Sequence, residues 1–238
     1  MEGHTRINKY LAEAGICSRR EADKLIQAGL VQINGKTAHS GARVMQQDQV
    51  TLRGKPVNKE QEVHVLAYYK PVGVTCTEKD VYAKKTVIEE LNYPIRVTYA
   101  GRLDKDSEGL LLMTNDGSLI NELMRAANFH EKEYVVRVVK ELTEDFLQKI
   151  GAGVYLKELE QTTRPCRVEA LGKYTFSIIL TQGLNRQIRR MCEALGYRIK
   201  TLKRVRIANI GLDKLKPGEY RRLDAHKLQE LYAYLKEK

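Results

Sequence analysis

Short strand-forming segments joined by turns fill most of residues 62–238, and they limit the fold of this chain more than any other feature. The predicted strands are residues 63–69, 74–77, 96–100, 110–114, 133–139, 167–171, 175–181, 198–200 and 204–210. Fewer helices are predicted, at residues 86–91, 119–124, 143–150, 185–195 and 225–235, with Ser118 and Asp224 as N-caps of two of them. This mixture predicts an α+β domain with a mixed, mostly antiparallel sheet.

Residues 4–60 have a different pattern, which predicts a small separate domain of two helices and hairpins. The segment Ser18–Glu21 has the form of a capping box, which starts a helix. A predicted strand at residues 30–33 is followed by Asn34-Gly35, a strong hairpin signal. Residues 53–63 are polar and charged, and we expect them to form the linker to the second domain.

The net charge of +11 favours a polyanionic partner, because a strongly basic protein attracts nucleic acid at long range. Two clusters hold many of the cations. One comprises Arg186, Arg189, Arg190, Arg198, Lys200, Lys203, Arg204 and Arg206. The other comprises Arg6, Lys9, Arg19, Arg20 and Lys24. Clustering of this kind predicts a nucleic-acid-binding protein rather than one with an evenly basic surface.

The N-terminal cluster lies within a recognisable set of segments. Residues 6–11, 18–22 and 29–35, in this order, resemble the S4-like RNA-binding domain. The resemblance implies that the cations of this cluster bind RNA. The alternative is a capped helix pair whose charged face is only solvated.

One carboxylate of the second domain is placed in a loop directly before an apolar strand. Asp104 lies between Gly101 and Gly109, with Arg102 two residues before it, and the predicted strand 110–114 follows. Such a loop can present an ionised aspartate to a substrate without burying it unpaired. The commoner role of an aspartate in a turn is to bond to the local backbone.

Four segments of the second domain together resemble a family of enzymes. Lys70–Gly73, Gly101–Leu111, Lys132–Tyr134 and Gln182–Met191 are similar, in order and spacing, to RNA pseudouridine synthases of the RsuA/RluB/E/F type. The resemblance implies an N-terminal S4-like domain at residues 4–60 and a catalytic domain at residues 62–238. Residues 130–134 and 183–187 are most similar to the F branch of this family, which implies 23S rRNA as the substrate.

The reaction of this family detaches uracil from its ribose, rotates the base and rejoins it through a ring carbon. By resemblance, Asp104 attacks either the ribose or the uracil ring, and the sequence leaves both routes open. Tyr134 is expected to pack on the target base. Arg189 is the expected partner of Asp104, and a helical projection places it at the edge of the apolar face that contains Ile188 and Met191. Arg190 projects away and is expected to bind phosphate.

The target base must leave its stack before it can react, and Arg102 is expected to fill the space that it vacates. By the same resemblance, we expect further RNA contacts from Lys70, Lys132, Asn185, Arg186, Gln187 and Arg190. Lys105 and Asp106 are expected to lie on the loop surface.

We expect no metal, because the four cysteines lie outside metal-ligand spacing of one another and of any histidine, and the reaction needs no cofactor. No apolar run is long enough to span a bilayer and no apolar signal core is evident, so we expect a cytoplasmic protein that contacts no membrane. A monomer is the default expectation. Two alternatives stay open, a tRNA-modifying synthase and a non-catalytic RNA-binding assembly factor.

Overall fold

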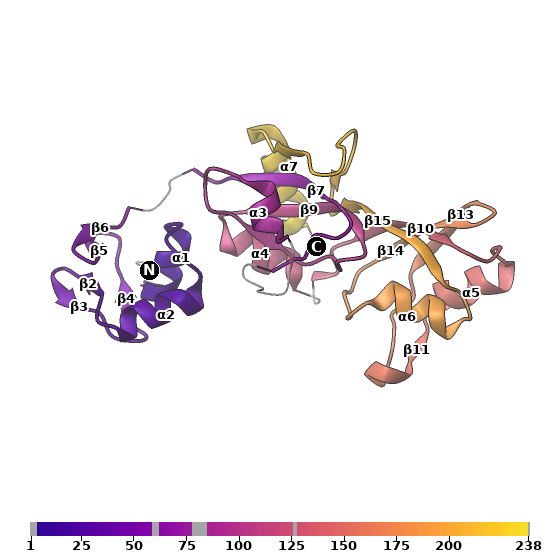
Figure 1. The fold of residues 1–238 in the computed structure, drawn as a ribbon, viewed down its shortest axis with the longest axis horizontal. Helices are drawn as coiled ribbons and strands as arrows, with labels where there is room; N and C mark the ends of the chain where they lie inside the picture. The colour runs from indigo at the N-terminus through magenta and orange to yellow at the C-terminus, as the bar shows by residue number, and fades with distance from the viewer. Residues whose placement is uncertain (1–3, 59–61, 78–84, 126–127, 238) are drawn as a thin grey trace. The chain divides into compact units, whose positions relative to one another are not determined.

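The computed structural model describes residues 4–58, 62–77, 85–125 and 128–237 (Figure 1). The chain divides into two compact units. The smaller unit contains the described residues up to His64, with Tyr93–Val97 and Asn115–Gly117, and the larger unit contains the rest.

The smaller unit consists of two helices and short strands. The helices are α1 (Ile7–Glu13) and α2 (Arg19–Gln27). The strands are β1 (Thr5–Arg6), β2 (Val31–Ile33), β3 (Lys36–Thr37), β4 (Arg43–Val44), β5 (Val50–Leu52) and β6 (Lys55–Pro56). They form a four-stranded sheet in the order β3-β2-β5-β6 and a separate β1-β4 pair. The Ser18 side chain accepts a hydrogen bond from the Glu21 backbone N–H at 3.2 Å, which confirms the predicted N-cap.

The predicted linker was wrong at its beginning. Lys55 and Pro56 pair with Leu52 and Thr51 as strand β6, through a turn at Arg53-Gly54. Both turn residues have positive φ, 51° and 75°, a conformation that an arginine rarely adopts. The hairpin was not predicted because this segment is polar and charged, a composition that is typical of loops.

The larger unit contains a nine-stranded sheet whose main path runs β13-β14-β10-β15-β9-β7-β17. The strands are β7 (Val65–Lys70), β8 (Thr98–Ala100), β9 (Glu108–Thr114), β10 (Lys132–Val138), β13 (Arg167–Gly172), β14 (Thr175–Leu180), β15 (Ile199–Ile207), β16 (Ile210–Gly211) and β17 (Tyr220–Arg222). Every pairing is antiparallel except that of β15 with β9. The sheet is therefore mixed and mostly antiparallel, as predicted.

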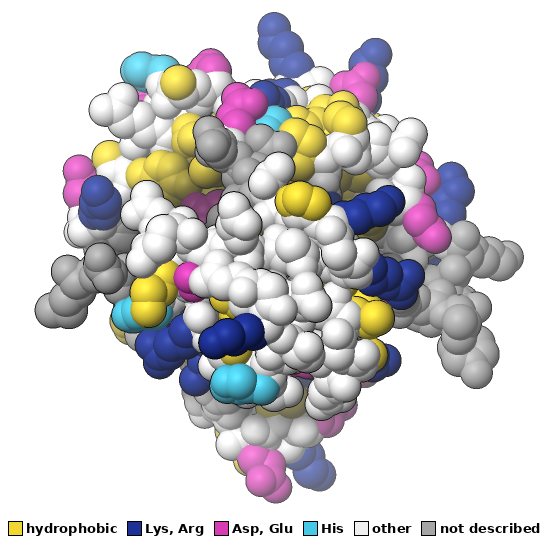
Figure 2. Space-filling view, turned by 90° about the vertical axis from the view of Figure 1, so that its left-hand side faces the viewer, with side chains coloured by type: hydrophobic (Ala, Val, Ile, Leu, Met, Phe, Trp, Pro, Cys, Tyr) yellow, Lys and Arg dark blue, Asp and Glu magenta, His cyan; other side chains and the backbone are white. Residues whose placement is uncertain are grey.

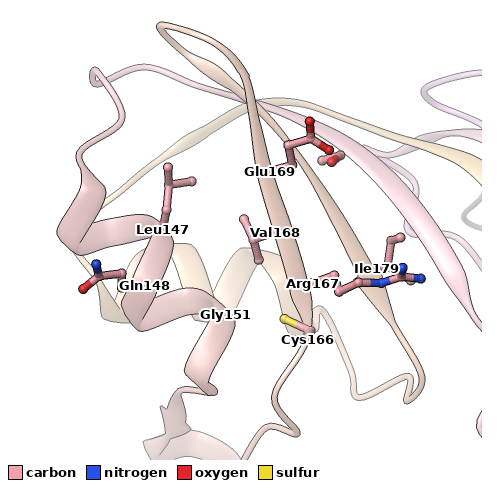
Figure 3. A pocket seen from close by; sticks show the side chains of 9 residues that line it. Leu147, Gln148, Gly151, Cys166, Arg167, Val168, Glu169 and Ile179 are labelled. Atoms are coloured by element: carbon pink, nitrogen blue, oxygen red, sulfur yellow. The ribbon is translucent and has the colours of Figure 1, made fainter.

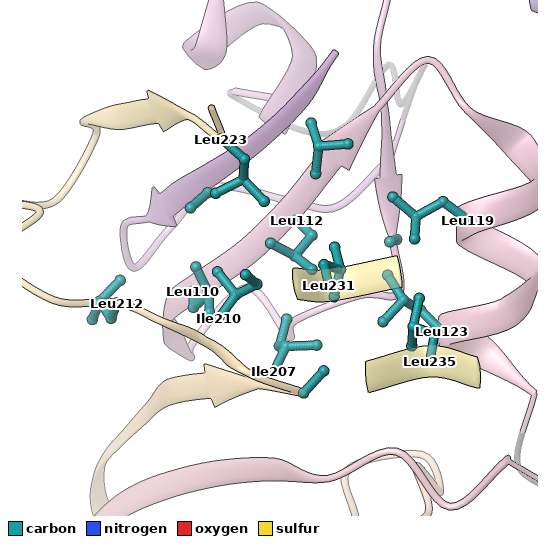
Figure 4. Packing of buried hydrophobic residues seen from close by; sticks show 14 of the residues in the cluster. Leu110, Leu112, Leu119, Leu123, Ile207, Ile210, Leu212, Leu223, Leu231 and Leu235 are labelled. Carbon is teal, nitrogen blue, oxygen red and sulfur yellow. The ribbon is translucent and has the colours of Figure 1, made fainter. Parts of the chain in front are cut away.

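Helices cover the sheet and enclose two apolar cores. The helices are α3 (Val87–Leu91), α4 (Gly117–Met124), α5 (Glu144–Ala152), α6 (Gln187–Ala194) and α7 (Ala225–Lys236). In the first core, Leu231 and Leu235 of α7 lie beside Leu110 and Leu112 of β9 (Figure 4). In the second, residues of α5 and α6 pack against β10 and β14. Burial of each such side chain contributes roughly 1.5–3 kcal/mol, so both cores stabilise the central strands that carry the site.

Some predicted elements of this unit differ from the structure. The predicted strands 198–200 and 204–210 are one long strand, β15, followed by β16. Residues 74–77 form no strand of the described sheet, only an isolated bridge between Thr75 and Thr86. Helix α4 begins at Gly117, so Ser118 lies in its first turn rather than at its N-cap. The pair β11 (Tyr155–Leu156) and β12 (Gln161–Thr162) and the short 3-10 helix Lys157–Leu159 between them were not predicted.

Candidate active site

A pocket of about 440 Å³ lies in the larger unit between the β8–β9 loop, β10, β15 and the segment before α6. The residues that line it include Arg102, Asp104, Lys132, Tyr134, Arg186 and Arg204. The structure therefore brings together Asp104 and Tyr134, which are predicted site residues from segments 30 positions apart.

The register of the central strands places part of this lining on one face. Tyr134 of β10 lies opposite Arg204 of β15, and Arg204 lies opposite Gly109 of β9. Lys132 and Tyr134 are two residues apart on β10, and side chains two positions apart share a face of a strand. The sheet thus positions an aromatic ring and two cations next to the Asp104 loop.

Arg204 supports the Asp104 loop from below. Its Nε donates to the Leu110 carbonyl at 2.7 Å and its Nη1 donates to the Arg102 carbonyl at 3.4 Å, so one buried guanidinium joins the two ends of the loop. Gly109 allows β9 to approach the β15 backbone closely here, because its φ is +109° and a Cβ there would collide with the backbone carbonyl of Arg204 and lie 2.7 Å from its backbone nitrogen.

Arg189 of α6 also holds this loop, through contacts with Asp106 and Ser107. Its Nη2 donates to the Asp106 carbonyl at 2.9 Å and to Ser107 Oγ at 3.1 Å, and its Nε lies 3.5 Å from Asp106 Oδ2. The predicted helical projection is confirmed in that Ile188 and Met191 are buried while Arg189 is partly exposed at the edge of that face. Lys105 and Asp106 are exposed on the loop, as predicted, and Asp106 is in addition an ion-pair partner of Arg189.

The predicted pairing of Asp104 with Arg189 was wrong. Asp104 Oδ2 lies 3.7 Å from Arg186 Nη1, while Arg189 is bound to Asp106. Arg186 also contacts both carboxylate oxygens of Asp106 at 3.3 Å. Burial opposes ionisation of Asp106, but the hydrogen bonds from Arg186 and the charge of Arg189 lower its pKa below the ordinary value. Asp104 has 33% of its side chain exposed, so it remains open to the pocket.

Three of the predicted RNA contacts are engaged within the protein. Lys70 is fully buried, and its Nζ donates to the carbonyls of Pro71 and Val74 at 2.8 and 2.9 Å. Gln187 is buried, and its Oε1 accepts from the Leu184 backbone N–H at 3.1 Å. These two side chains close loops beside the pocket, which corrects their predicted role as RNA contacts.

Arg190 is the third predicted RNA contact that is engaged within the protein. It is ion-paired with Glu158 and its Nε donates to the Asn185 carbonyl at 3.0 Å, so it is not the free phosphate-binding group that the helical projection predicted. Arg102, Asn185 and Arg186 are exposed, and Lys132 is partly buried in the pocket.

The cations of the smaller unit lie mainly on its surface. Arg6, Arg19, Arg20 and Lys24 are exposed, and Lys9 is 3.5 Å from Glu13. Figure 2 shows Lys and Arg side chains in separate groups on the face toward the viewer, some of them beside Asp and Glu side chains. Their accessibility is compatible with the predicted RNA contacts, which stay a prediction.

A second pocket, of about 570 Å³, lies between α5 and the edge strand β13 (Figure 3). Its lining includes Leu147, Cys166, Val168 and Glu169, and it contains none of the predicted site residues. Burial raises the pKa of Cys166 to about 11, so this thiol is not an activated nucleophile.

Two site residues were not predicted as such, Arg204 and Asp106. Arg204 was seen only as one cation of a cluster. The sequence did hold a signal, since Arg204 is two positions from Leu202 on one strand, so that the two side chains share a buried face, and arginine is rarely buried unless it has a partner. Among the described residues, no helix is long and apolar enough to cross a membrane.

Comparisons with known proteins agree with this geometry. Residues 64–194 match the family model described as RNA pseudouridylate synthase, and residues 5–50 match that of the S4 domain. The chain is 44% identical to a Salmonella typhi protein named dual-specificity RNA pseudouridine synthase RluF, over 96% of this chain and 78% of that protein. It is 39% identical to the Bacillus subtilis ribosomal large subunit pseudouridine synthase B, over 96% of both chains.

A solved structure is also similar. It is described as a crystal structure of pseudouridylate synthase, is 29% identical, and superposes with a TM-score of 0.70 over 95% of this chain and 99% of that chain. The chain therefore belongs to the RNA pseudouridine synthase family, as an isomerase with an N-terminal S4 domain.

Proposed function

We propose that this protein converts a specific uridine of 23S rRNA to pseudouridine, with Asp104 as the group that attacks the target nucleotide. The observation that carries the proposal is the position of the Asp104 carboxylate, which opens onto the 440 Å³ pocket beside Arg186 and shares that pocket with Tyr134. The relatives named as ribosomal large subunit and dual-specificity RNA synthases support an rRNA substrate.

The described contacts suggest how the site acts. The guanidinium of Arg186 lies 3.7 Å from the Asp104 carboxylate, beside the group that we propose attacks the substrate. Arg189 and Arg204 fix the loop, so the carboxylate meets the substrate in one geometry. Tyr134 offers a ring on which an everted base can stack, and the exposed Arg102 can fill the gap left in the RNA.

Residues 4–60 would supply RNA affinity through Arg6, Lys9, Arg19, Arg20 and Lys24, and residues 62–238 would supply the chemistry. The enzyme would act in the cytoplasm as a monomer. The word dual-specificity in the names of several relatives favours a second RNA substrate, for which we expect a tRNA.

The test is an incubation of the purified protein with 23S rRNA and tRNA transcripts, followed by mapping of pseudouridine. Asp104→Asn keeps the size of the side chain and removes its charge, so we expect RNA binding without product. Asp145→Asn, at an exposed position of α5, is the matched control and should form product at the wild-type rate. Equal product from Asp104→Asn and wild type would remove Asp104 from the chemistry, and no product from wild type on any RNA would contradict the function.

A further inference from the structure

Two cations in the pocket have no acidic partner. Arg204 is 3% exposed, and while its Nε and Nη1 bind carbonyls of the Asp104 loop, its Nη2 is buried without a hydrogen-bond partner. Lys132 has one weak contact, from its Nζ to the His130 carbonyl at 3.4 Å. Among the described residues, no carboxylate forms an ion pair within 4 Å of the charged nitrogens of either side chain; those beside the pocket pair with other arginines.

This arrangement is unfavourable for the protein alone. Burying a charge without a counter-ion costs free energy, and two neighbouring cations repel each other. Burial, followed by the charge of Arg204, lowers the pKa of Lys132 to about 8. An anion bound between the two side chains would remove both penalties. The charge of the pocket is therefore suited to an anionic ligand.

The chemistry of the proposed function, on which this inference rests, supplies such an anion. When Asp104 forms a bond to the ribose C1′, the C1′–N1 bond breaks and its electron pair stays on the base. The detached uracil then carries a negative charge spread over N1, O2 and O4. The base turns until C5 faces C1′, C5 forms the new bond as the Asp104 carboxylate leaves, and the proton lost from C5 is balanced by one gained at N1.

We propose that Lys132 and Arg204 form a cationic floor that binds the exocyclic oxygens of the detached uracil anion and promotes its departure. The half turn of the base exchanges the positions of O2 and O4. A floor made only of donors can serve both oxygens, since neither lysine nor arginine can accept a hydrogen bond. Backbone phosphates would meet the exposed Arg102 and Arg186 before reaching these less accessible groups.

The test uses Lys132→Met rather than a variant of Arg204. Arg204 also holds the Asp104 loop, so its removal would change both the loop and the charge of the pocket. The substrate is an RNA carrying either uridine or 5-fluorouridine at the mapped target position. Fluorine withdraws electrons and stabilises the departing base anion. Single-turnover cleavage of C1′–N1 is followed by rapid quench and digestion to nucleosides, and RNA affinity is measured separately.

We expect Lys132→Met to slow cleavage of the uridine substrate about 10²–10³-fold, the range for loss of one donor that stabilises a developing anion, with RNA affinity within about twofold. The loss of cleavage rate should be clearly smaller with the 5-fluorouridine substrate, and Lys132→Arg should recover most of the rate. Lys173→Met, which removes an exposed lysine paired with Glu141 at 3.0 Å, is the charge-matched control and should react like wild type.

Two results for Lys132→Met would overturn the proposal. One is an equal loss of cleavage rate on the uridine and 5-fluorouridine substrates, and the other is a loss of RNA affinity with no loss of cleavage rate. Should Lys132→Met fail to fold, Lys132→Gln gives the same comparison. These failures differ from failure of the proposed function, in which wild type itself would leave the uridine unchanged.

Discussion

Replacement of Lys132 by methionine should stabilise the free protein while it slows the reaction. Methionine has a similar length, and it removes a charge that has no acidic partner among the described residues of the pocket. The pKa of Lys132 is lowered from its ordinary 10.5 to about 8, chiefly by burial. At about 1.4 kcal/mol for each pKa unit, this shift costs the folded protein about 3 kcal/mol at pH 7.

The pH dependence of this gain has a definite sign. Below pH 8 the folded and unfolded chains both hold the proton, so the whole cost is present. Between pH 8 and 10.5 the folded protein alone has released it, and the cost declines. The charged and titratable groups that share the pocket with Lys132 are Cys76, Arg102, Asp104, Tyr134, Arg186, Arg204 and the exposed Lys105. Because the folded protein releases this proton first, the free-energy cost of burying Lys132 should fall by about 1 kcal/mol between pH 7 and pH 9.

Because the side chain is partly exposed, water screens part of the cost, and we expect Lys132→Met to raise the free energy of unfolding by about 1–3 kcal/mol at pH 7. Urea unfolding at pH 7 and pH 9, followed by far-ultraviolet circular dichroism, measures it, since the chain has no Trp. Lys149→Met, at an exposed site paired with Asp145, should change stability by less than about 0.5 kcal/mol. A Lys132→Met protein that is no more stable than wild type at pH 7 would refute the reasoning.

Two further predictions concern the loop and the RNA-binding unit. Gly109→Ala should destabilise the protein by about 2–4 kcal/mol in the same assay, since its φ is +109° and the new Cβ would press on the Arg204 backbone, whereas Gly172→Ala has open space and should cost less than about 1 kcal/mol. A small loss of stability in Gly109→Ala would show that the loop can relax to accept the new Cβ. The double variant Arg19→Ala and Arg20→Ala should lower the slope of log affinity against log salt by about 1.4–1.8, with the single-turnover rate at saturation unchanged; an unaltered slope would remove these arginines from the RNA contact.

Local features of the sequence predicted the helices well, because caps depend on nearby residues. Thr143 and Asp224, like Ser18, accept a hydrogen bond from the backbone three residues later, at the helix starts that the sequence indicated. Strand limits were less predictable. Residues 201–203 lack a strong strand signal, yet pairing with β10 and β9 on either side keeps β15 continuous.

The partners of charged side chains were the least predictable part of the site. Arg186 and Arg189 lie on one short segment, and which of them reaches Asp104 depends on how the β8–β9 loop folds against α6. Periodicity gave the face of Arg189 correctly, but it carries no information about that loop. Lys70 binds carbonyls within its own turn, a contact set by the turn's conformation rather than by the motif's composition.

The central claim is that a charged carboxylate at position 104 converts uridine to pseudouridine. Pseudouridine mapping of rRNA and tRNA from cells that lack this protein, complemented with wild type or with Asp104→Asn, tests it most directly. We predict that at least one 23S rRNA uridine is modified only with wild type, although both proteins bind the RNA. Full modification of that uridine by Asp104→Asn would contradict the account.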